Sequence, residues 1–199
     1  MSNYPSTKGK ALFFSQTLAC KNKAHKIAYI AILSAFVIIS NMYEFKLPGT
    51  QFSLTLAVSA LVGMIIGPIF GFLACFLGDL IGFLYNSAGF AYMPWIGIAT
   101  GLTASIFGLI VNGIEGKNKN FWVYKVIVAG LVSFLLCTVL INTTALWITF
   151  NQMKTPFHVY LYTRLFISGQ IWNSLLNYGI LFFIIPALNR VKALRIQIK

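Results

Sequence analysis

The sequence predicts an all-α integral membrane protein: a bundle of six transmembrane helices with both termini in the cytoplasm. Hydrophobic residues make up 58% of the 199 residues and charged residues only 9%, whereas a soluble domain carries about a quarter charged residues. The mean hydropathy is +0.81, and the apolar residues gather in runs long enough to cross a bilayer. The net charge of +12 would suggest nucleic acid in a hydrophilic chain, but no hydrophilic surface remains for a basic patch, so no nucleic-acid partner is expected.

Apolar runs account for the transmembrane domain, residues 27–188. A helix needs about 20 apolar residues to cross a hydrocarbon layer of about 30 Å, and about 17 suffice when the flanks adapt. Gly67-Pro68 divides a stretch that is too long for one crossing, because Gly-Pro is a strong turn signal. The expected spans are 27–42, 52–66, 69–85, 95–111, 121–148 and 161–188.

Lys and Arg predict the orientation, because they concentrate on the cytoplasmic side of membrane proteins. Twelve of the 15 lie in the N-terminal segment 1–26, around the central connection and in the tail 189–199. Both basic segments are therefore expected in the cytoplasm, where they also favour anionic membrane lipid. Because no small-residue cleavage site follows the first run, we expect an uncleaved first span rather than a signal peptide. The outer connections are then 43–51, 86–94 and 149–160.

The composition excludes several chemistries. Three cysteines far apart in sequence, two histidines and three acidic residues are too few for a disulfide framework, a metal centre or a catalytic carboxylate pair. The phosphate-binding pattern G-x-x-x-x-G-K-[ST] is absent from the sequence, so the chain is not expected to bind ATP itself. We expect no cofactor, and any active transport needs a partner or an ion gradient.

Asp79 is the most informative residue within the spans. An ionised carboxylate at a helix centre costs about 2.5–3.5 kcal/mol on insertion scales and therefore needs a compensating contact. Asp79 lies about 9 Å below the outer end of its span, close to the outer connections. It either locks the bundle through a buried partner or contacts a ligand. Arg164, near the outer start of the last span, is a candidate partner for Asp79 or a clamp for a substrate carboxylate.

Amides and aromatic rings extend this polar set. Asn142 lies in the middle of the fifth span and Gln170 in the outer half of the last one, where each makes either an interhelical hydrogen bond or a ligand contact. Gln170 is the better ligand candidate, whereas Asn177, deeper in the same helix, is expected to be structural. Tyr92, Trp95 and Trp147 lie at the outer boundary, as an ordinary aromatic belt or as rings that stack on a planar heterocycle.

Small residues recur at helical spacing. Three glycine series in the second, third and fourth spans are expected to serve close helix packing. The first span instead carries Ala28, Ala31 and Ala35 and is peripheral in sequence. Its alanine face is therefore the candidate surface for another protein.

Five stretches together resemble one family. They are GPIFG at 67–71, LGDLIGF at 77–83, GFAYMPW at 89–95, LINTTALW at 140–147 and YTRL at 162–165. Their order and spacing are similar to those of the substrate-binding S components of energy-coupling factor (ECF) vitamin transporters, in the folate family. The resemblance covers residues 27 to about 190.

The resemblance implies a subunit of a bacterial plasma membrane transporter that captures a water-soluble vitamin in an outward cavity. It also implies partners, a transmembrane coupling subunit and two ATPases that use the ATP. The family's small-residue motif, which contacts the coupling subunit, maps onto Ala31 and Ala35.

Folate is the first candidate substrate and cobalamin the second. The carboxylates of folate suit Arg164, Lys46 or Lys154, and its pterin could donate to Asp79 and stack on Trp95 or Tyr92. Cobalamin would use His158 as a cobalt ligand. The stretch 53–58 lacks the proline typical of folate-type members, which keeps the second candidate open.

Two other function classes fit less well. An ion-coupled secondary transporter often shows broken spans in both halves, and this sequence has one Gly-Pro break without a counterpart. A membrane-embedded enzyme needs more reactive groups on one face than Asp79 and His158.

Overall fold

The computed structural model describes residues 14–15, 18, 22–43, 45–47, 50–85, 91–114, 121–149 and 151–190. Within these residues, five helical segments are long and apolar enough to cross a membrane. They are α2 (Lys23–Met42), α4 (Pro68–Tyr85), α5 (Pro94–Gly113), the continuous helix of α6 (Phe121–Ser133), η1 (Phe134–Thr143) and α7 (Thr144–Thr149), and α9 (Gln170–Arg190). The expected all-helical membrane fold is therefore confirmed, whereas the number of crossings is a separate question.

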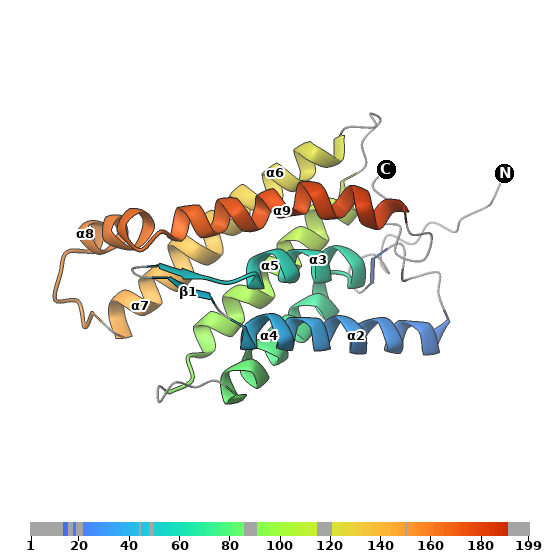
Figure 1. The fold of residues 1–199 in the computed structure, drawn as a ribbon, viewed down its shortest axis with the longest axis horizontal. Helices are drawn as coiled ribbons and strands as arrows, with labels where there is room; N and C mark the ends of the chain where they lie inside the picture. Colours follow the sequence, from blue (N-terminus) through green and yellow to red (C-terminus); the bar gives the residue numbers. More distant parts are fainter. Residues whose placement is uncertain are drawn as a thin grey trace.

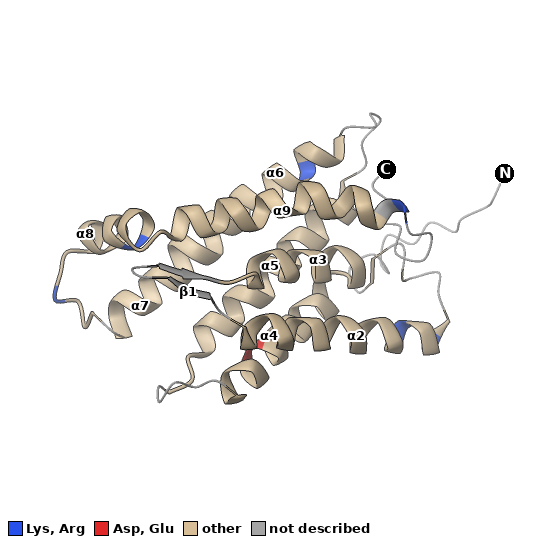
Figure 2. Ribbon diagram, viewed as in Figure 1, with Lys and Arg blue, Asp and Glu red and all other residues tan. Residues whose placement is uncertain are grey.

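The helices form an elongated bundle with two different ends (Figure 1). We call one the basic end, where α2 and α6 begin and α3, α5 and α9 finish. We call the other the hairpin end, where α2 and α4 finish, α5 and α9 begin and α7 lies. Figure 2 shows that the described Lys and Arg residues lie at these ends, and that the acidic residue on α4 lies beside the place where α2 finishes.

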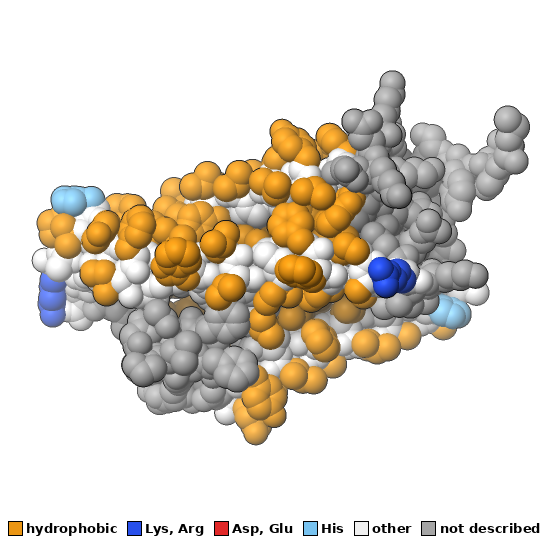
Figure 3. Space-filling view, turned by 45° about the horizontal axis from the view of Figure 1, so that its top comes forward, with side chains coloured by type: hydrophobic (Ala, Val, Ile, Leu, Met, Phe, Trp, Pro, Cys, Tyr) orange, Lys and Arg blue, Asp and Glu red, His pale blue; other side chains and the backbone are white. Residues whose placement is uncertain are grey.

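The lateral surface of the bundle is apolar. On the face shown in Figure 3, the Lys, Arg and His side chains lie at the two extremities, and the described surface between them is largely hydrophobic. Phe183 and Leu175 of α9, for example, are 82% and 60% exposed. A surface of this kind is stable in hydrocarbon and unfavourable in water, which agrees with a membrane location.

The second expected span, 52–66, is only partly helical. Its first residue ends a β-hairpin of β1 (Phe45–Leu47) and β2 (Thr50–Phe52), in which Lys46 pairs with Gln51. The helix α3 (Thr55–Ile66) has 12 residues and is about 18 Å long, shorter than a hydrocarbon core. The described part of the chain therefore contains five long apolar helices and one short one, and the count of six crossings stays a prediction.

The last expected span, 161–188, is broken. Its first residues belong to α8 (Phe157–Tyr162) and η2 (Thr163–Ile167), and α9 begins only at Gln170. The chain turns at Gly169, whose φ of 69° is a conformation that glycine adopts without a Cβ penalty. The expected Gly67-Pro68 turn is confirmed, because Gly67 alone separates α3 from α4.

Glycines bring the central helices into close contact. A Cβ on Gly63 of α3 would lie 1.8 Å from the Ala104 carbonyl oxygen of α5, and one on Gly78 of α4 would lie 2.6 Å from Val37 Cγ1 of α2. Substitution at either position would force the helices apart. The glycine series therefore serve internal packing, as expected.

Two residues of the segment before α2 are buried in the basic end. Ser15 and Leu18 are 0% and 1% exposed, and Leu18 packs in one core cluster with residues of α2, α3, α4 and α5. The Ser15 amide donates to the Ile66 carbonyl over 2.8 Å, and its hydroxyl donates to the Ile65 carbonyl. These bonds cap the last turn of α3, whose carbonyls would otherwise be unpaired.

Candidate functional site

Asp79 and Tyr92 form the best-defined polar contact at the hairpin end. The Tyr92 hydroxyl donates to Asp79 Oδ2 over 3.2 Å. Asp79 is the twelfth residue of α4, and Tyr92 lies two residues before α5. The contact therefore links the end of α4 to the start of α5 across a connection whose residues 86–90 lie outside the described part.

Small and aromatic residues surround this pair. A Cβ on Gly97 would lie 2.5 Å from the Tyr92 hydroxyl oxygen and 3.1 Å from Asp79 Oδ2, so a side chain there would displace this pair. The Phe83 ring lies 5.2 Å from the Tyr92 ring, centroid to centroid. Burial, and secondly the Asp79 carboxylate, raises the pKa of Tyr92 to about 12. The phenol is therefore protonated at neutral pH and remains a donor.

Three other polar side chains near this end have a buried atom without a hydrogen-bond partner. These atoms are Asn41 Nδ2 on α2, Asn142 Oδ1 on η1 and Arg164 Nε on η2. An unpaired buried donor or acceptor costs about 1–3 kcal/mol, and more for a charged group. Two of these atoms are donors and one is an acceptor, so each could form a hydrogen bond with a polar group of a ligand.

Arg164 does not pair with Asp79. The neighbour of its guanidinium is the Tyr160 hydroxyl, and α8, which leads into η2, lies well apart from α4 in Figure 1. Of the two roles expected for Arg164, the partner of Asp79 is therefore not realised. The clamp for a substrate carboxylate stays a prediction.

Trp147 stabilises the connection 149–160. Its Nε1 donates to the Thr155 carbonyl over 2.8 Å, and its ring meets Phe157 edge-on at 5.4 Å between centroids. The Asn151 side chain donates to the Thr155 hydroxyl over 2.7 Å. Trp147 thus has a structural contact, and its stacking on a ligand is an untested prediction.

The remaining predicted site residues occupy the same end, and among their described side chains no mutual contact defines a site. Trp95, in the first turn of α5, is 48% exposed. His158 on α8 is exposed, and Gln170 is the half-buried first residue of α9. Lys46 lies on β1, but its side chain falls outside the described residues.

Asn177 is structural, as expected from its depth. Its Oδ1 accepts the Ala57 amide over 3.0 Å, and its Nδ2 donates to the Ser53 carbonyl over 2.8 Å. These bonds hold the start of α3 in the place of an N-cap side chain, since α3 has no such cap of its own.

Sequence reasoning missed Asn41 as a candidate site residue. Asn41 is the penultimate residue of α2 and lies within the expected first span, 27–42. Its Oδ1 accepts the Thr55 hydroxyl over 3.0 Å, which leaves its Nδ2 as the unpaired donor. The sequence contained no signal for Asn41, because the hairpin that follows α2 was not expected.

The alanine face of α2 is uncovered in the chain. Ala28, Ala31 and Ala35 are all exposed, and Ile32 and Phe36 beside them are 68% and 56% exposed. Within α2, Val37 is the residue that is fully buried. The face is thus free for a partner or for lipid, and its role as a partner interface stays a prediction.

Fold and site together define a helical membrane protein with a polar, incompletely paired site near one end. The model of the family "ECF-type riboflavin transporter, S component" matches residues 21–190. The chain therefore belongs to this family of ECF-type S components. Membership makes it a transporter subunit and not an enzyme.

Two further proteins are similar to this chain. A UPF0397 protein from Lactiplantibacillus plantarum is 33% identical over 109 residues, which are 51% of this chain and 55% of the relative. The chain thus spans about half the length of that curated relative. A solved structure, described as FolT bound with folic acid, aligns with a TM-score of 0.63 at 20% identity. That alignment covers 85% of this chain and 95% of the other and supports the fold.

Proposed function

We propose that this chain is the substrate-capturing subunit of an ATP-driven vitamin uptake transporter, with its vitamin site at the hairpin end. The family match over residues 21–190 carries the proposal. In this role the chain binds the vitamin without ATP, and separate ATPases supply the energy.

The unpaired groups at the hairpin end support a binding role there. Asn142 Oδ1 and Arg164 Nε are buried without partners, and an ordinary packing role would have left them paired or exposed to solvent. A vitamin with donors and acceptors on a heterocycle could satisfy them. Asp79 and Tyr92 then orient one edge of the ring, and Trp95 offers a surface for stacking.

Folate is our first candidate substrate. It carries carboxylates, which complement the guanidinium of Arg164 and the ammonium of Lys46. Folic acid is the molecule bound in the similar solved structure. Riboflavin, which the family description names, offers a flat ring with donors and acceptors but no carboxylate. Cobalamin, with His158 as a cobalt ligand, ranks behind both because nothing in the fold favours it.

The proposed orientation places the hairpin end outside and the basic end inside a bacterial plasma membrane. The six-crossing count requires that α3, though short, crosses with the help of the hairpin at one end and of Ser15 at the other. Both termini are then cytoplasmic, as the distribution of Lys and Arg favours.

The proposed partners are a transmembrane coupling subunit and two ATPases. The exposed face of Ala28, Ala31 and Ala35 is the proposed contact with the coupling subunit, because small residues allow close helix approach in a membrane. Replacement of Ala31 by Leu should impair uptake and leave vitamin binding unchanged. The matched control is Leu84→Phe, a bulkier side chain at an exposed site of α4. Equal loss of binding and uptake would assign the alanine face to internal packing.

Uptake by cells tests the proposal directly. Cells that express this chain together with an ECF coupling subunit and ATPases should accumulate labelled folate or riboflavin. Cells that express this chain alone should show little sustained uptake. Concentrative uptake by the chain alone, driven by a proton or sodium gradient, would instead identify a secondary transporter and overturn the proposal.

A further inference from the structure

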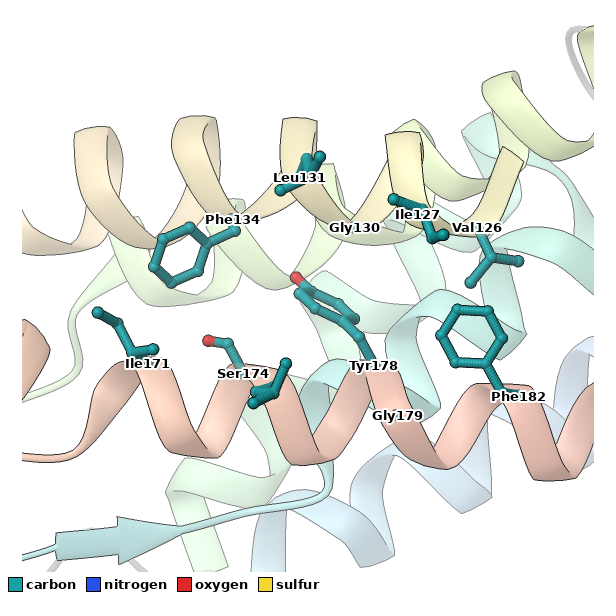
Figure 4. Close-up of a pocket in the computed structure, with 11 residues that line it drawn as sticks. Val126, Ile127, Gly130, Leu131, Phe134, Ile171, Ser174, Tyr178, Gly179 and Phe182 are labelled. Atoms are coloured by element: carbon teal, nitrogen blue, oxygen red, sulfur yellow. The ribbon is translucent and has the colours of Figure 1, made fainter. Parts of the chain in front are cut away.

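A groove between α6 and α9 lies away from the proposed vitamin site. Its volume is about 320 Å³, and its walls are almost entirely apolar (Figure 4). The lining residues come from α6 and the first residue of η1 on one side, including Val126, Gly130 and Phe134, and from α9 on the other, including Ile171 and Phe182. None of the described residues that line it is charged.

The groove opens toward the membrane. Both of its helices belong to segments that are long and apolar enough to span a bilayer. Leu131 and Leu175 line it and are 59% and 60% exposed. Its open side therefore faces hydrocarbon, and an uncharged, flexible and apolar occupant matches its walls.

Two glycines leave room on the groove floor. A Cβ on Gly179 would meet no atom within 4 Å, and one on Gly130 would make ordinary contact with the Tyr178 ring at 3.5 Å. Gly179 is thus not needed for helix packing, in contrast to Gly63 and Gly78. Its missing side chain instead preserves an open channel beside α9.

One polar atom in the groove has no partner. Ser174 is 3% exposed and its Oγ is buried without a hydrogen bond. In Figure 4 its side chain projects from α9 toward α6, between Ile171 and Tyr178. The neighbouring Tyr178 hydroxyl is already paired, because it donates to Ser133 Oγ over 3.2 Å. A buried hydroxyl without a partner favours an occupant that carries an acceptor at this depth.

The length of the groove indicates which kind of molecule fits it. From Ile171 to Phe182 the groove runs about 16 Å along α9, which is about half of a hydrocarbon core of about 30 Å and hence the length of one chain in one leaflet. Ser174 lies one turn from the start of α9, close to the level where a lipid's ester groups begin. We propose that the groove binds one acyl chain of an ester-linked membrane lipid, with the Ser174 hydroxyl donating to the ester carbonyl.

Such a lipid would connect two helices that carry proposed vitamin ligands. Asn142 follows α6 in the same continuous helix, and Gln170 begins α9. An acyl chain that fills the groove supplies the dispersion contacts that an empty groove lacks. Lipid in the groove therefore stabilises the bundle independently of any vitamin.

Photo-crosslinking with phosphatidylcholine that carries a diazirine in the middle of one ester-linked chain tests this proposal. The purified chain is reconstituted in bilayers of this lipid, and mass spectrometry maps the labelled peptides. We expect labelling of the α6 and α9 groove residues at least ten-fold above that of other lipid-facing positions. Uniform labelling around the bundle would mean annular lipid only and would overturn the proposal. Absence of labelling at the groove residues, as expected if these faces of two copies pack together, would also overturn it.

Two variants locate the site. Gly179→Leu should abolish the groove labelling, because the new side chain fills the channel without a clash. Gly113→Leu is the matched control, since a Cβ there also meets nothing within 4 Å and it lies outside the groove.

A separate experiment tests the proposed hydrogen bond from the Ser174 hydroxyl to the ester carbonyl. Ser174→Ala should remove the preference for the ester-linked probe over a diether analogue and leave apolar labelling largely in place. An equal preference of the wild type for ester and diether probes would remove Ser174 from the site.

Discussion

The polar groups at the two ends of the bundle differ in how completely they are hydrogen-bonded. At the basic end, polar groups from neighbouring segments satisfy the helix termini. Ser15 caps the last carbonyls of α3, and the Asn112 side chain donates to the Met64 carbonyl over 3.1 Å. Lys125, which the sequence suggested to be part of a basic connection, is instead 1% exposed in α6. Its ammonium donates to the Val111 carbonyl over 3.3 Å at the end of α5, where a cation is favourable.

The hairpin end leaves polar atoms without partners. Asn41, Asn142 and Arg164 each have one buried atom that is not hydrogen-bonded within the described residues. The hydrogen-bonded polar groups of the basic end stabilise the bundle. The unpaired polar groups of the hairpin end are available to a ligand. Substitutions at the basic end should therefore affect stability, and those at the hairpin end should affect binding.

The largest expected effect is the loss of stability when Leu18 is shortened. Leu18→Ala should lower the free energy of unfolding by about 2–5 kcal/mol, because it removes a fully buried side chain from a core shared by four helices. Thermal unfolding in detergent measures the change. Leu84→Ala, at a position that is 71% exposed, is the control and should have little effect. Equal stability of the two variants would show that the residues before α2 do not support the bundle.

The next largest effect concerns vitamin affinity. Arg164→Gln should weaken folate binding by about 1.5–3 kcal/mol, or ten-fold to a hundred-fold, because a charged hydrogen bond to a carboxylate is lost. Calorimetric titration of the variant measures it. Arg190→Gln, at an exposed position of the basic end, is the control and should leave affinity unchanged. If folate binds equally well to the Arg164 variant, its carboxylates lie elsewhere.

A smaller effect is expected from the contact between Asp79 and Tyr92. Tyr92→Phe should weaken vitamin binding by about 1 kcal/mol, roughly five-fold, because Asp79 loses an orienting donor. Thermal stability should change less than in Leu18→Ala. A variant that loses stability but retains full affinity would assign this pair to the scaffold.

The smallest effect is spectroscopic. Because the pKa of Tyr92 is raised to about 12 from an unfolded value of about 10, the folded chain holds this proton where the unfolded chain has lost it. The Tyr92 contribution to stability is therefore present below pH 10 and is lost as the pH rises toward 12. Ultraviolet titration of tyrosinate should show one late ionisation fewer in Tyr92→Phe. An unchanged late phase would mean that Tyr92 titrates normally.

The sequence predicted the helices well where an apolar run coincided with one helix. The Gly67-Pro68 turn and the internal role of the glycines followed from local chemistry, and Asn177 was correctly read as structural. The hairpin of β1 and β2 was missed, because its six residues lie at the edge of an apolar run and include both polar and apolar types. The break at Gly169 was missed because apolar residues continue on both sides of it.

The site was less predictable than the fold. The positions of Asp79 and Tyr92 at the hairpin end followed from their distances to the span ends, but their mutual contact depends on how α4 and α5 pack. Arg164 was a possible partner of Asp79 only while the residues of η2 and α9 were taken as one helix. Sequence periodicity cannot show which of several buried amides remains unpaired, since that depends on neighbours from other helices.

Calorimetric titration of the purified chain without ATP tests the central claim most directly. Folate and riboflavin should be compared with cobalamin, thiamine and pantothenate under the same conditions. The account predicts saturable binding of one vitamin with a stoichiometry of one per chain, and weaker binding of folate to Arg164→Gln if folate is that vitamin. Absence of binding to all five in a chain that unfolds cooperatively would contradict a vitamin site at the hairpin end.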